Sequence, residues 1–148
     1  MASGGGTNLQ ALIDASERGD LSAKIALVIS NNSKSGALER ARKHDIPGVH
    51  ISSRTHEDPD QALLGAVREH ECQVIALAGY MKKLPESLIA AFPDHIVNIH
   101  PGPLPAFGGQ GMFGDHVHER VLAAGVDQSG PTVHIVTCLL YTSDAADE

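Results

Sequence analysis

Short runs of consecutive apolar residues constrain the fold of this chain most strongly. They occupy residues 25–29, 74–78 and 96–97. Continuously apolar strands, unlike alternating ones, are typical of a parallel sheet that is covered on both faces. Segments with the apolar spacing of helices lie between these runs. The alternation predicts an α/β domain with a mainly parallel open sheet and helices on both faces.

Two helix starts are marked by capping residues. Asp58 followed by Pro59 predicts a helix with an N-cap aspartate and proline in its first turn. Thr7 with Gln10 three positions later fits a capping box, directly after glycines 4–6. Glycines let the backbone approach a ligand closely, and a helix N-terminus favours an anion, so this stretch is a candidate phosphate site. A flexible linker is the alternative, and the capping box argues against it.

Asn98 and His100 come at the end of an apolar strand, immediately before Pro101. Side chains alternate along a strand, so the two residues point to the same face. Proline has no amide hydrogen for the sheet, so the strand ends here, and open α/β sheets hold their sites at such carboxyl ends. An amide can donate to a carbonyl oxygen, and a histidine can move a proton near neutral pH. The pair suits chemistry at a carbonyl carbon, although a turn cap and a structural histidine fit the spacing equally well.

The apolar spacing also predicts a helix over residues 115–124 that ends at Gly125, with Leu122 among its inward-facing side chains. His116 and His118 fall near its start. Residues two apart do not share a helix face, so we do not expect them to form a metal site.

Composition argues against several classes of protein. The formal net charge is -7 and aromatic residues make up 3% of the chain, so neither a basic nor a base-stacking surface for nucleic acid is expected. No apolar run approaches the roughly 20 residues of a membrane span, and the first residues do not resemble a signal peptide. The two cysteines form neither a disulfide framework nor a metal-ligand spacing. We therefore expect a cytoplasmic protein.

Four separated segments carry a specific resemblance to a known family. They are residues 3–10 (SGGGTNLQ), 77–81 (LAGYM), 98–101 (NIHP) and 132–134 (TVH). In this order and approximate spacing they resemble the phosphoribosylglycinamide formyltransferases, the folate-dependent transformylases of de novo purine biosynthesis. The resemblance covers about residues 3 to 137, and four motifs in register are far more specific than a glycine-rich loop alone.

The resemblance implies a Rossmann-like formyltransferase fold and a reaction. A formyl group would pass from the co-substrate 10-formyltetrahydrofolate to the amine of glycinamide ribonucleotide, without a metal. Asn98 and His100 match the catalytic pair of the family. Asn98 would stabilise the negative charge that develops on the formyl oxygen, and His100 would assist electrostatically and in proton transfer.

The resemblance also implies where the two small-molecule substrates bind. Backbone groups of Gly6, Thr7 and Asn8 would hold the phosphate of the ribonucleotide. The folate pocket would be lined by Leu77, Met81 and Leu84. The glycine-rich loop over residues 107–114 would help to close over the nucleotide. The oligomeric state is left open.

The chain departs from the family pattern after Thr137. The family has a catalytic aspartate shortly after this strand, whereas Tyr141 stands about there in this chain. Asp144 comes a few residues late and lacks a following Gly-Pro, so the role is not transferred to it. We expect residues 1–137 to be an incomplete formyltransferase domain without its first strand and C-terminal part. We further expect residues 138–148 to be a non-native tail, and this chain by itself to be close to inactive.

Other functions compete with the leading one. Related enzymes with similar strands include a formyltetrahydrofolate hydrolase and a methionyl-tRNA formyltransferase. The glycine loop over residues 4–6 favours a small phosphorylated substrate, and the negative net charge of the chain opposes a tRNA substrate. A non-catalytic nucleotide-binding module would keep that loop but would not need Asn98 and His100 on one face.

Overall fold

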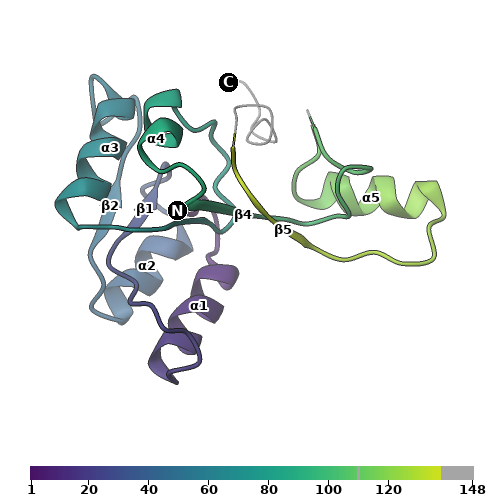
Figure 1. Ribbon diagram of the computed structural model, residues 1–148, viewed down its shortest axis with the longest axis horizontal. Helices are drawn as coiled ribbons and strands as arrows, with labels where there is room; N and C mark the ends of the chain where they lie inside the picture. The colour runs from purple at the N-terminus through teal and green to yellow at the C-terminus, as the bar shows by residue number, and fades with distance from the viewer. Residues whose placement is uncertain (110, 138–148) are drawn as a thin grey trace.

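A computed structural model describes residues 1–109 and 111–137 (Figure 1). In chain order the elements are α1 (Thr7–Glu17), β1 (Val28–Ser30), α2 (Gly36–Lys43), β2 (Gly48–His50), α3 (Pro59–Glu69), β3 (Ile75–Leu77), α4 (Glu86–Ala91), β4 (Ile96–His100), α5 (Asp115–Ala124) and β5 (Thr132–Ile135). The predicted alternation of strands and helices is confirmed. None of the helices in these two ranges is long and apolar enough to cross a membrane. The predicted tail over residues 138–148 lies outside the described residues.

Parallel pairing dominates the strands, as predicted. Strand β1 pairs with β2 and β3 pairs with β4 in parallel, whereas β4 and β5 are antiparallel. Residues 1–3 join the two sheets. The Ala2 amide donates to the Ile29 carbonyl at 3.0 Å, and the Ala78 amide donates to the Met1 carbonyl at 2.9 Å. The strands therefore follow the order β2, β1, residues 1–3, β3, β4, β5, with the antiparallel strand at one edge.

Helices cover both faces of the sheet, because neighbouring residues of a strand point to opposite sides. Val28 packs with Leu9 and Ile13 of α1 and with the buried alanines of α2. The next residue, Ile29, belongs to a larger core that contains buried side chains of α3 and α4, such as Leu64 and Leu88. Two apolar cores thus enclose the sheet, one on each face.

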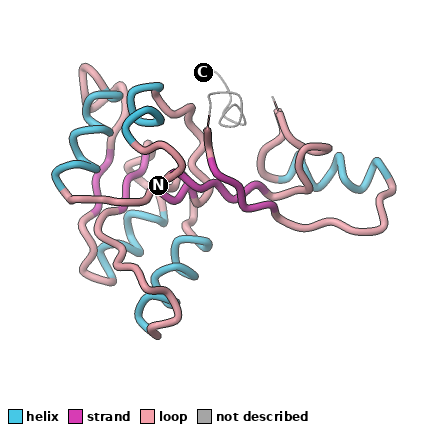
Figure 2. Tube along the Cα trace, in the orientation of Figure 1, coloured by secondary structure: helices cyan, strands magenta, loops and turns pink. Residues whose placement is uncertain are grey.

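Strands β4 and β5 lead out of this body to an arm that ends in α5 (Figures 1 and 2). Helix α5 has the predicted bounds and ends at Gly125, whose φ of 61° is left-handed. Val117 and Val121 are buried, but Leu122 is 79% exposed, so its predicted inward position was wrong. Only the side of α5 that carries Val117 and Val121 is buried, so the buried stripe of this helix is narrow.

Local sequence signals fixed some boundaries and not others. The Asp58 carboxylate accepts a hydrogen bond from the Gln61 amide at 3.0 Å and caps α3 as predicted. In contrast, the apolar run over residues 25–29 forms a strand only from Val28 onward. Its partner β2 begins after Pro47, which has no amide hydrogen with which to extend the ladder.

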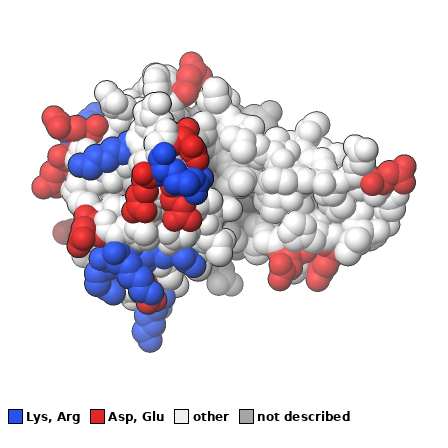
Figure 3. Space-filling model, turned by 90° about the horizontal axis from the view of Figure 1, so that it is seen from below, with Lys and Arg blue, Asp and Glu red and all other residues white. Residues whose placement is uncertain are grey.

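The charged side chains are distributed unevenly over the face in Figure 3. Acidic and basic residues are interspersed on the body, whereas the arm shows acidic side chains in this view. This face has no continuous basic stripe.

Candidate active site

A cleft of about 430 Å³ opens at the carboxyl ends of β3 and β4. Its lining residues come from the α1 N-terminus, the β3 and β4 ends, the α5 arm and the turn before β5: Asn8, Leu77, Gly79, Tyr80, Met81, Lys82, Asn98, Ile99, Pro101, Phe113, Gly114, His118 and Pro131. The cleft therefore lies between the body and the arm. This is the edge of the sheet where the sequence predicted a site.

Asn98 lines the cleft from the middle of β4 and is half-buried. The antiparallel register places it opposite His134 of β5, and its Nδ2 lies 3.1 Å from His134 Nε2. The Nδ1 atom of the same imidazole lies 3.3 Å from the Ile135 carbonyl oxygen. With its proton on Nδ1, His134 donates to that carbonyl and accepts from Asn98 through Nε2. In this arrangement one amide hydrogen of Asn98 goes to His134, and the residue lines the cleft.

His100 lies deeper than Asn98 and is 1% exposed. Its Nε2 donates to the Phe107 carbonyl oxygen at 2.6 Å. The turn above the imidazole is tightly packed, since a Cβ on Gly102 would come within 2.4 Å of Val117 Cγ1 and 3.8 Å of His100 Nε2. The structure thus brings Asn98 to the cleft wall and holds His100 beneath the turn. A catalytic part for His100 stays a prediction.

The glycine loop precedes α1 directly. Gly6 is the N-cap residue with a left-handed φ of 73°, and a Cβ there would stand 2.9 Å from Ala37 Cα. Thr7 and Asn8 form the exposed start of α1, and Asn8 reaches the cleft. The predicted capping box was wrong, because no side chain caps this helix and Gln10 bonds to Arg40 instead.

The three residues expected to bind folate have different surroundings. Leu77 is buried in β3 and lines the cleft, and Met81 lines it with 36% of its surface exposed. Leu84 is 1% exposed and packs in the core shared with α3 and α4, so it lies behind the cleft wall. Tyr80 also lines the cleft, and burial, with a smaller contribution from Asp60, raises the pKa of its hydroxyl to about 12.

Sequence reasoning had not placed His134 or His118 in the site. His134 lies opposite Asn98 because β5 pairs with β4 in an antiparallel register. Knowing that register would have been needed to find His134 from the sequence. His118 lines the cleft from α5 in the arm. Within residues 1–109 and 111–137, no three His, Cys, Asp or Glu residues are grouped so that they could hold a metal ion.

Comparisons with known proteins identify the family to which this chain is similar. The formyl transferase family matches residues 1–140. The chain is 40% identical to a chloroplastic phosphoribosylglycinamide formyltransferase of Vigna unguiculata, over 90% of this chain and 44% of the relative. It is 35% identical to the phosphoribosylglycinamide formyltransferase of Bacillus subtilis, over 91% of this chain and 68% of the relative. The chain spans about half the length of the first curated relatives that it matches.

Solved structures give the same result. Glycinamide ribonucleotide transformylase 1 from Symbiobacterium toebii superposes with a TM-score of 0.84 at 34% identity, over 93% of this chain and 65% of that one. A formyltetrahydrofolate deformylase from Pseudomonas syringae superposes with a TM-score of 0.79 at 30% identity, over 93% of this chain and 44% of that one.

Proposed function

Because this chain belongs to the formyl transferase family, we propose that its cleft transfers a formyl group from 10-formyltetrahydrofolate to the amine of glycinamide ribonucleotide. This reaction is a step of de novo purine biosynthesis, and relatives of this chain are named phosphoribosylglycinamide formyltransferases. The resemblance to phosphoribosylglycinamide formyltransferases found in the sequence is confirmed.

The observation that carries the proposal is the Asn98 amide, which is held by His134 in a cleft that begins at the N-terminus of α1. The substrate amine attacks the formyl carbon, and negative charge develops on the formyl oxygen. A preorganised amide donor stabilises that charge. The attack forms the carbon–nitrogen bond to the ribonucleotide and gives a tetrahedral adduct. When this adduct collapses, the bond to the folate nitrogen breaks, and the proton lost by the amine passes to that nitrogen. We assign the oxyanion contact to Asn98 and an electrostatic and proton-transfer part to His100.

Substrate binding is assigned along the same cleft. We assign the substrate phosphate to backbone groups of Gly6, Thr7 and Asn8, where free amides and the helix dipole favour an anion. We assign the folate to the wall with Leu77 and Met81, which Leu84 supports from the core. The chemistry needs no metal and no covalent bond between substrate and enzyme. The cytoplasmic location expected from the sequence stays a prediction, and two relatives are named chloroplastic.

Hydrolysis of 10-formyltetrahydrofolate is the less favoured alternative, because a deformylase superposes on the chain at lower identity and TM-score than a transformylase does. Water would then take the place of the amine. The two reactions differ in whether loss of the formyl group requires the ribonucleotide.

The test mixes the purified chain with 10-formyltetrahydrofolate, with and without glycinamide ribonucleotide, and follows both folate and formylated product. Calorimetry measures binding of each substrate separately. Because this chain lacks the expected aspartate, we expect formyl transfer far below an ordinary enzymatic rate. We expect that slow loss of the formyl group to depend on the ribonucleotide, and Asn98→Ala to remove it while ribonucleotide binding persists. Formate release at the same rate without ribonucleotide would favour the hydrolase. Ribonucleotide binding without any chemistry would favour a nucleotide-binding module.

A further inference from the structure

Helix α2 holds the glycine loop from behind through two consecutive carbonyl groups. The Ala37 amide donates to the Gly4 carbonyl oxygen at 3.2 Å, and Arg40 Nε donates to the Gly5 carbonyl oxygen at 2.8 Å. The next carbonyl, that of Gly6, accepts from the Gln10 amide of α1 at 2.9 Å. Three successive peptide groups are therefore oriented by hydrogen bonds to their oxygens.

The orientation of these carbonyls fixes the direction of the following amides. In a trans peptide group the N–H points away from the C=O, and the peptide bonds of this loop are trans. The amides of Gly5 and Gly6 therefore point away from the groups that hold the carbonyls of Gly4 and Gly5. No hydrogen bond joins either amide to another residue in the described part of the chain. Successive free amides on one side of a loop form a concave nest that suits an anion.

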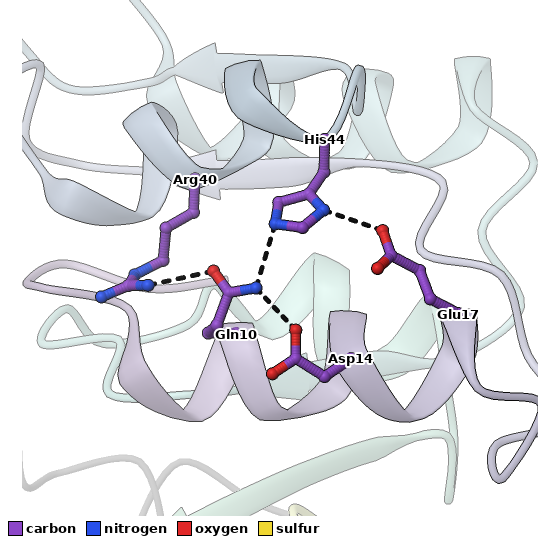
Figure 4. A network of polar contacts seen from close by, with 5 residues as sticks. All are labelled: Gln10, Asp14, Glu17, Arg40 and His44. Atoms are coloured by element: carbon purple, nitrogen blue, oxygen red, sulfur yellow. Dashed lines mark hydrogen bonds and ion pairs between the residues drawn. The ribbon is translucent and has the colours of Figure 1, made fainter.

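Arg40 is itself held in place by a polar network between α1 and α2 (Figure 4). Its Nη1 donates to Gln10 Oε1 at 2.9 Å. The Gln10 amide nitrogen in turn donates to Asp14 Oδ1 at 2.7 Å and lies 3.0 Å from His44 Nε2. His44 Nδ1 lies 2.8 Å from Glu17 Oε1. The guanidinium fork is thus bonded to the loop through one nitrogen and to α1 through another.

The loop has little room to move toward α2. A Cβ added to Gly36 would lie 2.7 Å from the Gly5 carbonyl oxygen, so the start of α2 already touches this peptide group. Movement away from α2 is opposed by the donors of Ala37 and Arg40. Of these two donors, the Arg40 guanidinium is the one that a side-chain substitution can remove.

We propose that Arg40 is a positioning residue for phosphate recognition: by holding the Gly5 carbonyl toward α2, it aims the Gly6 amide at the phosphate of the substrate. This inference rests on the proposed function, which places the substrate phosphate at this loop. Two donors in a fixed fork explain why an arginine, rather than a lysine, serves here, because an ammonium group cannot reproduce both bonds in that geometry.

The test compares three variants of the full chain: Arg40→Met, Arg40→Lys and Arg42→Met. Arg42 is an exposed arginine on the same helix, so its replacement removes the same charge without touching the loop. Calorimetry measures the Kd of glycinamide ribonucleotide, of ribose 5-phosphate and of 10-formyltetrahydrofolate. We expect Arg40→Met to weaken both phosphorylated ligands by about 10-fold, the scale of a lost hydrogen bond from a charged donor. The Kd of the folate should not change.

The lysine variant separates positioning from charge. We expect Arg40→Lys to behave like Arg40→Met, and Arg42→Met to behave like the unmodified chain. Amide NMR supplies a direct readout, since ribose 5-phosphate should shift the Gly5 and Gly6 amide signals in the unmodified chain and shift them less in both Arg40 variants. Thermal unfolding checks that each variant is folded.

Three results would overturn the inference. They are unchanged phosphate affinity in Arg40→Met, full affinity in Arg40→Lys, and an equal loss in Arg42→Met. Failure of the proposed function is a different result: the chain would bind ribose 5-phosphate but not glycinamide ribonucleotide, and the Arg40 comparison would still be decided on ribose 5-phosphate. If the unmodified chain binds neither phosphorylated ligand, both proposals fall.

Discussion

The Ser3 hydroxyl accepts a hydrogen bond from the Met81 backbone amide at 2.7 Å, although 78 positions separate the two residues. The same hydroxyl donates to Asn31 Oδ1 in the loop after β1. Ser3 itself is buried. One side chain therefore ties the beginning of the glycine loop to the segment that forms a wall of the cleft. The proposed phosphate and folate regions are coupled through it.

Replacing Ser3 with alanine removes both bonds at once. We expect Ser3→Ala to lower the free energy of unfolding by about 1–3 kcal/mol, because the Met81 amide and the Asn31 side chain each lose a partner. The Kd of 10-formyltetrahydrofolate should rise more than that of the ribonucleotide, because Met81 lines the cleft. Urea unfolding and calorimetry measure the two effects. The control is Ser33→Ala, which changes an exposed serine, and equal stability of the two variants would contradict the expectation.

Two glycines with similar backbone conformations allow the packing of the glycine loop to be measured. Gly6 and Gly19 have φ of 73° and 78°, but a Cβ at Gly6 would meet Ala37 at 2.9 Å whereas one at Gly19 would meet no atom within 4 Å. We expect Gly19→Ala to cost about 1–2 kcal/mol, the usual price of a left-handed conformation for alanine. Gly6→Ala should cost more, because the α1–α2 contact must also open. Thermal or urea unfolding gives the difference, and equal costs would show that the loop yields freely.

The sequence was sufficient wherever a feature depends on near neighbours. Asp58 caps α3 and Gly125 ends α5 because each acts within one turn of its own helix. The apolar runs predicted a sheet covered on both faces, and the carboxyl end of β4 was located by Pro101. Asn98 was found in the same way, and it does line the cleft.

Features that depend on distant partners were missed or misassigned. Gln10 fits a capping box by spacing, yet its side chain bonds to Arg40 of another helix. His134 enters the site only through the antiparallel register with β4, which no local pattern specifies. Leu84 was expected in the folate pocket by resemblance; the structure places its side chain in the core with α3 and α4, and its part in folate binding stays a prediction. In each case the tertiary partner decides what the side chain does.

The bond between Asn98 and His134 predicts coupled kinetic effects. We expect His134→Ala to lower kcat of formyl transfer by about 10-fold, because the Asn98 amide loses the contact that orients it. Binding of the ribonucleotide should be unchanged. In the Asn98→Ala background the same change should cost much less, since the two residues act as a unit. The double-mutant cycle, with exposed His95→Ala as the control, measures this coupling, and additive losses would show that His134 acts independently of Asn98.

Tyr80 predicts how stability depends on alkaline pH. Its pKa is raised from 10.0 to about 12 in the folded chain, mainly by burial. Between these values the unfolded chain releases the phenolic proton and the folded chain keeps it, so the free energy of unfolding falls as pH rises. Below pH 10 the contribution is fully present. We expect the unmodified chain to lose about 2 kcal/mol more than Tyr80→Phe between pH 10 and 12. Urea unfolding across this range measures the difference. The other tyrosine, Tyr141, is present in both proteins and cancels in the comparison. Parallel curves for the two proteins would mean that the Tyr80 hydroxyl ionises as readily in the folded chain as in the unfolded one.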